Sequence, residues 1–179
     1  MAFTINKLGK GIALASLLAA AGTAYSAENG SLGATSSGSL DVSVEVADRV
    51  QISGLDDIDF GAYGGTGSLD GNDAFCVYRN GTGAYDVTIN SAQADSGDFR
   101  LSDGSNFITY SVTFNDDAAI TGGTDVSSGD SLAGNGSANS LTCGGANNAS
   151  LGVSIAEDAL QAAASGAYTD TITLVVAPR

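Results

Sequence analysis

The chain has no histidine and no tryptophan, and only one proline and two cysteines among 179 residues. Its lysines, Lys7 and Lys10, both lie near the N-terminus. The lack of histidine excludes an imidazole base and histidine-liganded metal sites, and the remainder of the chain has no lysine to form a Schiff base. Carboxylates and hydroxyls remain for catalysis, but no motif arranges them as an active site. We therefore expect a protein that is not an enzyme.

Positive charge is also scarce. The chain has 20 acidic and 6 basic residues, for a net charge of −14. No acidic residue precedes Glu28, whereas two of the basic ones do, so the chain from Glu28 onward carries 4 − 20 = −16. Such a charge repels nucleic acid and anionic membrane surfaces. We expect no nucleic-acid partner.

Residues 1–26 have the pattern of a secretory signal peptide. Lys7 and Lys10 precede an apolar run of 13 residues, and Ala24 and Ser26 suit positions −3 and −1 of a cleavage site. The run is short for a bilayer-spanning helix. We predict cleavage after Ser26, which leaves about 150 residues, a usual size for one domain.

Short alternating runs, separated by Gly, Ser, Asn and Asp, fill the rest of the chain and predict β-strands. Asn80-Gly81 between two such runs is a hairpin signal. The pattern is typical of an antiparallel, immunoglobulin-like β-sandwich. Residues 158–166 predict one or two helical turns, and residues 116–140 a surface loop or weak hairpin through Asp125 and Val126. Strands are expected near residues 39–48, 49–54, 58–63, 74–80, 84–90, 107–116, 149–158 and 168–179.

Cys76 and Cys143 are separated by 67 residues. In a secreted chain an even cysteine count favours a disulfide. The alternative is a metal or redox site, but two cysteines without histidine cannot complete a zinc site. We predict a Cys76–Cys143 disulfide and no cofactor.

Acidic clusters give weaker signals. Residues 55–61, 68–73 and 114–118 could offer oxygen ligands to calcium, but none has the spacing of an EF-hand. Paired acids such as Asp56 and Asp59 could serve a hydrolase, although nothing separates them from the other surface charges. Sequons stand at four asparagines, as expected by chance in such a composition: Asn29, Asn80, Asn135 and Asn148.

The segment Ser39–Asp48, "SLDVSVEVAD", has the most regular alternation of the chain, with apolar residues at Leu40, Val42, Val44 and Val46. The simpler interpretation is a first strand of the chain's own sandwich, and alternation by itself favours it. The other interpretation is a donor strand that inserts into a second copy. Alternation alone does not decide between the two interpretations.

The order of several motifs along the chain bears on this choice. "GSLDVSVEVADRVQI" is followed by "IDFGAY", by the cysteine-bearing "AFCVYRNGTGAYDVTIN" and by a closing "SGAYTDTITLVVAPR". This order resembles the spore-coat-protein-U family, the subunits of archaic chaperone–usher pili. The resemblance covers both ends of the chain, and residues 91–150 agree only in character. Family members often have a cysteine where this chain has Arg49 and Val50, and Pro178 and Arg179 are less apolar than a typical pilin end.

The resemblance implies an incomplete sandwich, residues 51–179, behind a leader and donor strand, residues 27–50. A periplasmic chaperone would lend a strand, and an outer-membrane usher would exchange it for the donor strand of the next subunit. The pilus would stand on the cell surface and serve attachment and biofilm formation. The alternative is a self-contained secreted sandwich that binds a surface or carbohydrate. The resemblance assigns the donor side chains to Leu40, Val42, Val44 and Val46, and the edge of the acceptor groove to Ile172, Leu174 and Val176.

Overall fold

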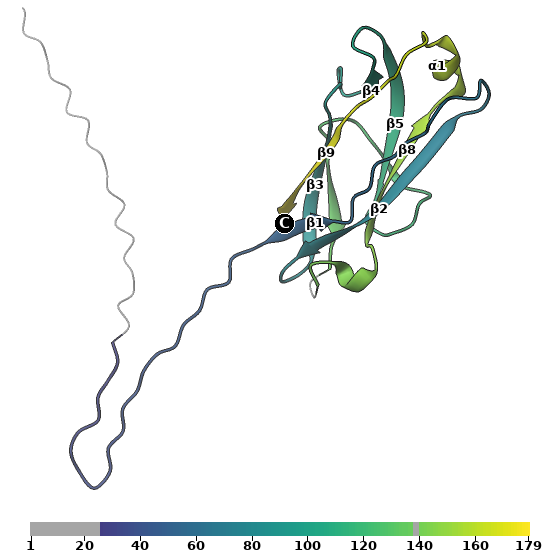
Figure 1. Cartoon of the computed structure of the whole chain (residues 1–179). Coiled ribbons are helices and arrows are strands. Elements are labelled where there is room, and N and C mark those ends of the chain that lie inside the picture. Colours follow the sequence, from purple (N-terminus) through teal and green to yellow (C-terminus); the bar gives the residue numbers. More distant parts are fainter. Residues whose placement is uncertain (1–25, 138–139) are drawn as a thin grey trace, which may run out of the picture. The chain divides into compact units, whose positions relative to one another are not determined.

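The computed structural model describes residues 26–137 and 140–179 (Figure 1). The predicted signal peptide thus lies outside the described residues, apart from Ser26. The chain divides into an N-terminal unit that ends at Glu45 and a body, Val46–Arg179. Within the described ranges, no helix is long and apolar enough to cross a membrane.

The body consists mainly of β-strands, with a single-turn 3-10 helix η1 (Cys143–Gly145) and a short α-helix, α1 (Glu157–Ala162). The helical turns predicted for residues 158–166 are confirmed by α1. The strands are β1 (Val50–Ser53), β2 (Leu69–Arg79), β3 (Ala84–Ser91), β4 (Phe99–Ser102), β5 (Phe107–Asn115), β6 (Thr124–Val126), β7 (Ser131–Asn135), β8 (Ala149–Ile155) and β9 (Ile172–Pro178).

These strands form two antiparallel sheets. The larger has the order β1-β2-β8-β5-β4, with β6 also paired to β5, and the smaller has the order β7-β3-β9. The run β1-β2-β8-β5 corresponds to strands A, B, E and D of an immunoglobulin domain, and β3 and β9 correspond to C and F. The predicted all-β, immunoglobulin-like sandwich is confirmed.

The core lies between the sheets and follows the alternation of the sequence. Successive side chains of a strand point to opposite faces, so one face of each of the strands β3, β5 and β8 is buried. The predicted inward residues of β3, β5 and β8 are buried: Tyr85, Val87, Ile89, Ile108, Tyr110, Val112, Phe114, Leu151, Val153 and Ile155.

One predicted pairing is wrong. Asn80-Gly81 does not close a hairpin, because β2 belongs to the larger sheet and β3 to the smaller one. The turn is tight, with Gly81 and Gly83 at positive φ, but it carries the chain from one layer to the other. The weak hairpin allowed for residues 116–140 does occur in part: β6, which contains Asp125 and Val126, pairs antiparallel with the preceding strand β5, whereas β7 pairs with β3. Turn chemistry fixes a local reversal, whereas the burial of each strand's apolar face decides its sheet.

The predicted disulfide is confirmed: Cys76 of β2 is bonded to Cys143 of η1. The bond ties the segment before β8 to the outward face of β2, where Cys76 is buried. Cys143 therefore lies in a helical turn that precedes the strand.

We expect the double variant Cys76→Ala, Cys143→Ala to lose about 4 kcal/mol of unfolding free energy, because the bond closes a 67-residue loop in the unfolded chain. Chemical denaturation of the oxidised wild type and the variant measures the difference. The wild type under reducing conditions should match the variant. Equal midpoints for the oxidised wild type and the variant would show that the crosslink adds nothing.

Candidate functional site

The last strand, β9, has one unpaired edge. It pairs with β3 from Ile172↔Ser91 to Pro178↔Tyr85. Among the described residues no strand pairs with its other edge. In a complete immunoglobulin domain the F strand lies between C and G. In the described chain β9 therefore occupies the place of an F strand, and a row of backbone groups on one of its edges lacks a ladder partner.

A groove of about 1100 Å³ lies in the body, and the start of β9 lines it. Its floor is the inner face of the larger sheet, so the groove reaches the hydrophobic core directly. The floor residues from β4, β5 and β8 are apolar or aromatic: Leu101, Ile108, Tyr110, Leu151, Val153 and Ile155.

The segment 55–63 borders this groove. The sequence predicted a strand at residues 58–63, but the segment joins no ladder. Instead Ile58 and Phe60 pack over Gly71 of β2, where a Cβ would lie 2.5 Å from Ile58 Cγ2 and 2.9 Å from Phe60 Cε1. The missing side chain at Gly71 thus lets the segment lie close against the sheet.

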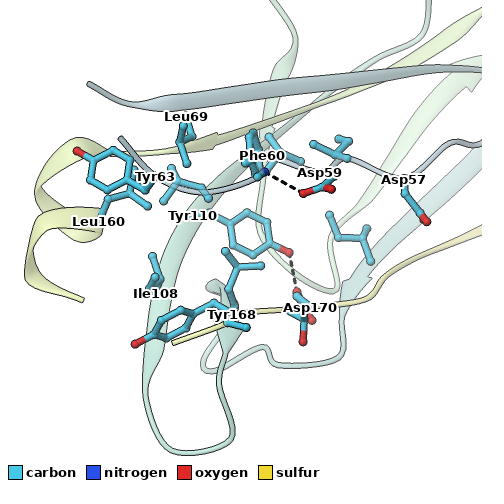
Figure 2. A pocket seen from close by; sticks show the side chains of 18 of the residues that line it. Asp57, Asp59, Phe60, Tyr63, Leu69, Ile108, Tyr110, Leu160, Tyr168 and Asp170 are labelled. Atoms are coloured by element: carbon cyan, nitrogen blue, oxygen red, sulfur yellow. Dashed lines mark hydrogen bonds between the residues drawn. The ribbon is translucent and has the colours of Figure 1, made fainter. Parts of the chain in front are cut away.

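Asp170 lines the groove on the side opposite to residues 55–63. Its carboxylate accepts hydrogen bonds from the hydroxyls of Tyr110 and Ser91, each at 2.6 Å, and from the backbone N–H of Gln93 at 3.1 Å. Figure 2 shows Tyr110 between Phe60 and Asp59 on one side and Asp170 on the other. Burial and the nearby carboxylate raise the pKa of Tyr110, so its hydroxyl remains a donor. These bonds fix the chain just before β9.

The predicted edge residues Ile172, Leu174 and Val176 are partly buried and pack against the core. Ile172 and Leu174 also line the groove. The alternate residue Val175 is exposed. β9 therefore turns one apolar face toward the core beside its unpaired edge.

The predicted donor side chains are exposed. The exposed fractions are 71% for Leu40, 88% for Val42, 88% for Val44 and 66% for Val46. Residues 40–49 are extended but belong to no strand, and Ser39 pairs only with Glu28, as an isolated bridge. The segment with the most regular strand pattern in the sequence therefore joins no sheet in the described part of the chain.

The acidic clusters acquire local structural roles. Asp59 accepts the N–H of Gly61 at 2.8 Å, and Asp73 accepts the N–H of Asp56 at 3.1 Å. In the described part of the chain, no group of three or more acidic or cysteine side chains is placed to hold a metal ion.

Sequence reasoning missed the groove-forming roles of Gly71, Tyr110 and Asp170. The closing motif "YTDT" contains Asp170, but nothing in its spacing names Tyr110, 60 residues earlier, as its partner. Gly71 lies in the acidic cluster of residues 68–73, most of which belongs to β2.

Fold and groove together define an immunoglobulin-like β-sandwich with an unpaired final edge over its core. No protein-family model and no curated protein matches the chain. A solved structure described as "Chaperone-tip adhesin complex is vital for synergistic activation of CFA/I fimbriae biogenesis" is similar, with a TM-score of 0.55 and 16% identity. The match covers 73% of this chain and 41% of that one. The likeness shows a shared β-sandwich fold.

Proposed function

We propose that this chain is a structural subunit of an extracellular pilus, polymerised head to tail by donor-strand complementation. The groove beside β9 accepts residues 40–46 of the next subunit, which pair with the unpaired edge. The observation that carries the proposal is this edge, next to a groove whose floor is the hydrophobic core.

The dimensions support this assignment. The span Leu40–Val46 has seven residues, as does β9. At about 3.3 Å per residue, each extends about 23 Å. Leu40, Val42, Val44 and Val46 point to one side of an extended chain, so all four would face the groove when the backbone pairs with β9.

The energetics are sufficient for a stable fibre. Burial of one Leu and three Val side chains contributes roughly 6–12 kcal/mol before the cost of ordering the segment. Ladder hydrogen bonds with β9 add to this and fix the register, because a slip by one residue would turn the apolar side chains outward.

The partners follow from the same groove. Before polymerisation its apolar floor needs a cover, and we propose a periplasmic chaperone that lends a strand and an outer-membrane usher that exchanges it. The similar solved structure is itself a complex of a chaperone with a tip adhesin. The motif order resembles the spore-coat-protein-U family, which favours the archaic branch of these pili. The resulting fibre would serve surface attachment and biofilm formation.

Purified material should run as an SDS-resistant ladder when unheated and collapse to one band after boiling, because each groove releases its strand only when the sandwich unfolds. Gel electrophoresis of heated and unheated samples, with negative-stain images of the same preparation, tests this. A single monomer band in both lanes, with no fibres, would favour a self-contained binding domain.

A further inference from the structure

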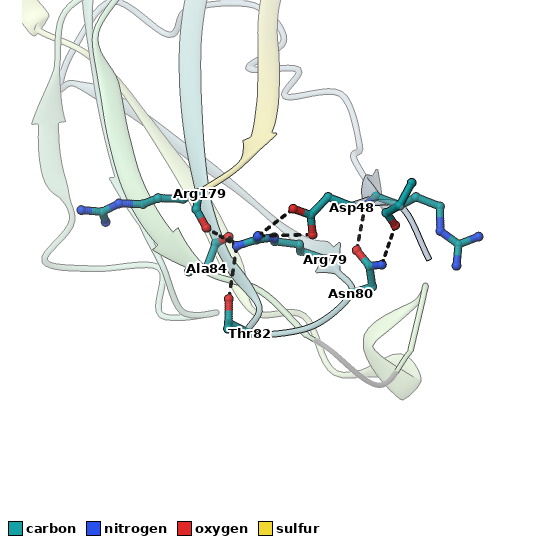
Figure 3. A network of polar contacts seen from close by, with 8 residues as sticks. Asp48, Arg79, Asn80, Thr82, Ala84 and Arg179 are labelled. Atoms are coloured by element: carbon teal, nitrogen blue, oxygen red, sulfur yellow. Dashed lines mark hydrogen bonds and ion pairs between the residues drawn. The ribbon is translucent and has the colours of Figure 1, made fainter. Parts of the chain in front are cut away.

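Arg79, the last residue of β2, lies beside Asp48, near the N-terminal end of the body (Figure 3). Its side chain is 9% exposed and forms an ion pair with Asp48 at 3.2 Å. The same guanidinium donates to the backbone carbonyls of Ala84 and Arg179 and to the Thr82 hydroxyl. One buried group thus connects Asp48, near the start of the body, to Arg179, which follows β9.

Asn80 holds the neighbouring backbone. Its side-chain Oδ1 accepts the N–H of Arg49 at 2.7 Å, and its Nδ2 donates to the carbonyl of Ala47 at 2.8 Å. The backbone N–H of Asn80 donates to the carbonyl of Arg49 at 3.2 Å. Residues 47–49 are therefore fixed on the body by side chain and backbone together.

This arrangement leaves no linker in the fibre. The last donor side chain is Val46, and the first backbone group held by the body is the carbonyl of Ala47. When Val46 lies in the groove of a neighbour, the two bodies are joined by one peptide step. A flexible linker needs several unconstrained residues to permit free reorientation.

We propose that residues 47–49 form a stiff joint between successive subunits, and that Arg79 and Asn80 set its stiffness. The inference rests on the proposed function. It assigns Arg79 and Asn80 a positioning role. They hold residues 47–49, where the donor strand leaves its own subunit, next to the end of β9, the strand that borders that subunit's groove. Bending of the fibre therefore has to break the contacts of Asp48 and Arg49, because no unconstrained segment joins the two subunits.

The experiment compares fibres assembled from the full chain by electron microscopy. Two variants loosen the joint on the body side, Asp48→Asn and Asn80→Ala, and a third inserts two glycines between Val46 and Ala47 without changing the body. Each should still form fibres, with a persistence length reduced by about half or more. The matched control is Asp95→Asn, which removes an exposed ion pair with Arg100 elsewhere on the body and should leave the persistence length unchanged.

Unchanged stiffness in the glycine insertion would overturn the stiff joint, although fibre formation would stand. Loss of fibres in Asn80→Ala alone would also overturn the assigned role, because it would make Asn80 an assembly residue. The absence of fibres from the wild type would instead contradict the proposed function, and the joint with it. As a second readout on the soluble subunit, amide exchange at Arg49 should accelerate in Asn80→Ala. Unaltered exchange there would contradict the hydrogen bond on which the inference depends.

Discussion

Val44→Asp should abolish fibres. Val44 is one of the two middle donor side chains, and in the proposed complex it would face the apolar and aromatic floor of the groove. An unpaired carboxylate there costs several kcal/mol of desolvation, a large part of the roughly 6–12 kcal/mol that burial provides. The body of the variant should still fold, because Val44 is exposed and lies outside the core. Electron microscopy and the unheated gel measure the loss.

Ser43→Asp is the matched control. It adds the same charge one residue away, on the face of the extended segment that points out of the groove. The control should retain fibres and the SDS-resistant ladder. Equal effects of the two substitutions, whether both abolish fibres or neither does, would contradict an alternating insertion with Val44 inside.

Relocation of the donor strand should produce a stable monomer. The rearranged protein lacks residues 27–46 at its N-terminus and carries residues 36–46 behind Arg179 on a short flexible linker, so that the strand can turn back along β9. It retains Asp48 for Arg79 and Val50 for β1. The reference protein lacks residues 27–46 and receives no strand. A net gain of about 5 kcal/mol would raise the melting temperature by about 10–20 °C.

A third protein separates groove filling from a nonspecific effect of the tail. It carries the relocated strand with Val44→Asp and should melt close to the reference protein. Calorimetry and size-exclusion chromatography of all three provide the comparison. A reference protein that is already a stable monomer, with no gain from the relocated strand, would show that the sandwich is complete without a donor.

The sequence by itself determined the class of the fold and most of its strands, although the strand expected at residues 58–63 does not form and β4 was not expected. Alternation at Tyr85–Ile89 and Ile108–Phe114 predicts inward faces because side chains alternate across any strand, whatever its partner. The Cys76–Cys143 disulfide was also predictable, since the chain offers no other cysteine. The alternation of residues 40–46 predicted that this segment forms a strand, but it could not predict which sheet the strand joins.

Only the tertiary structure decided which strands pair and where the groove lies. Asn80-Gly81 has the chemistry of a hairpin turn, yet it leads from one sheet to the other. The groove depends on Ile58 and Phe60 packing over Gly71, and on Tyr110 donating to Asp170, contacts between residues distant in the chain. Arg79 likewise meets Arg179 across 100 residues. A local sequence pattern indicates which face of its own strand a residue occupies. Strand pairing and grooves depend instead on the simultaneous burial of apolar faces from many strands, and no short segment contains that information.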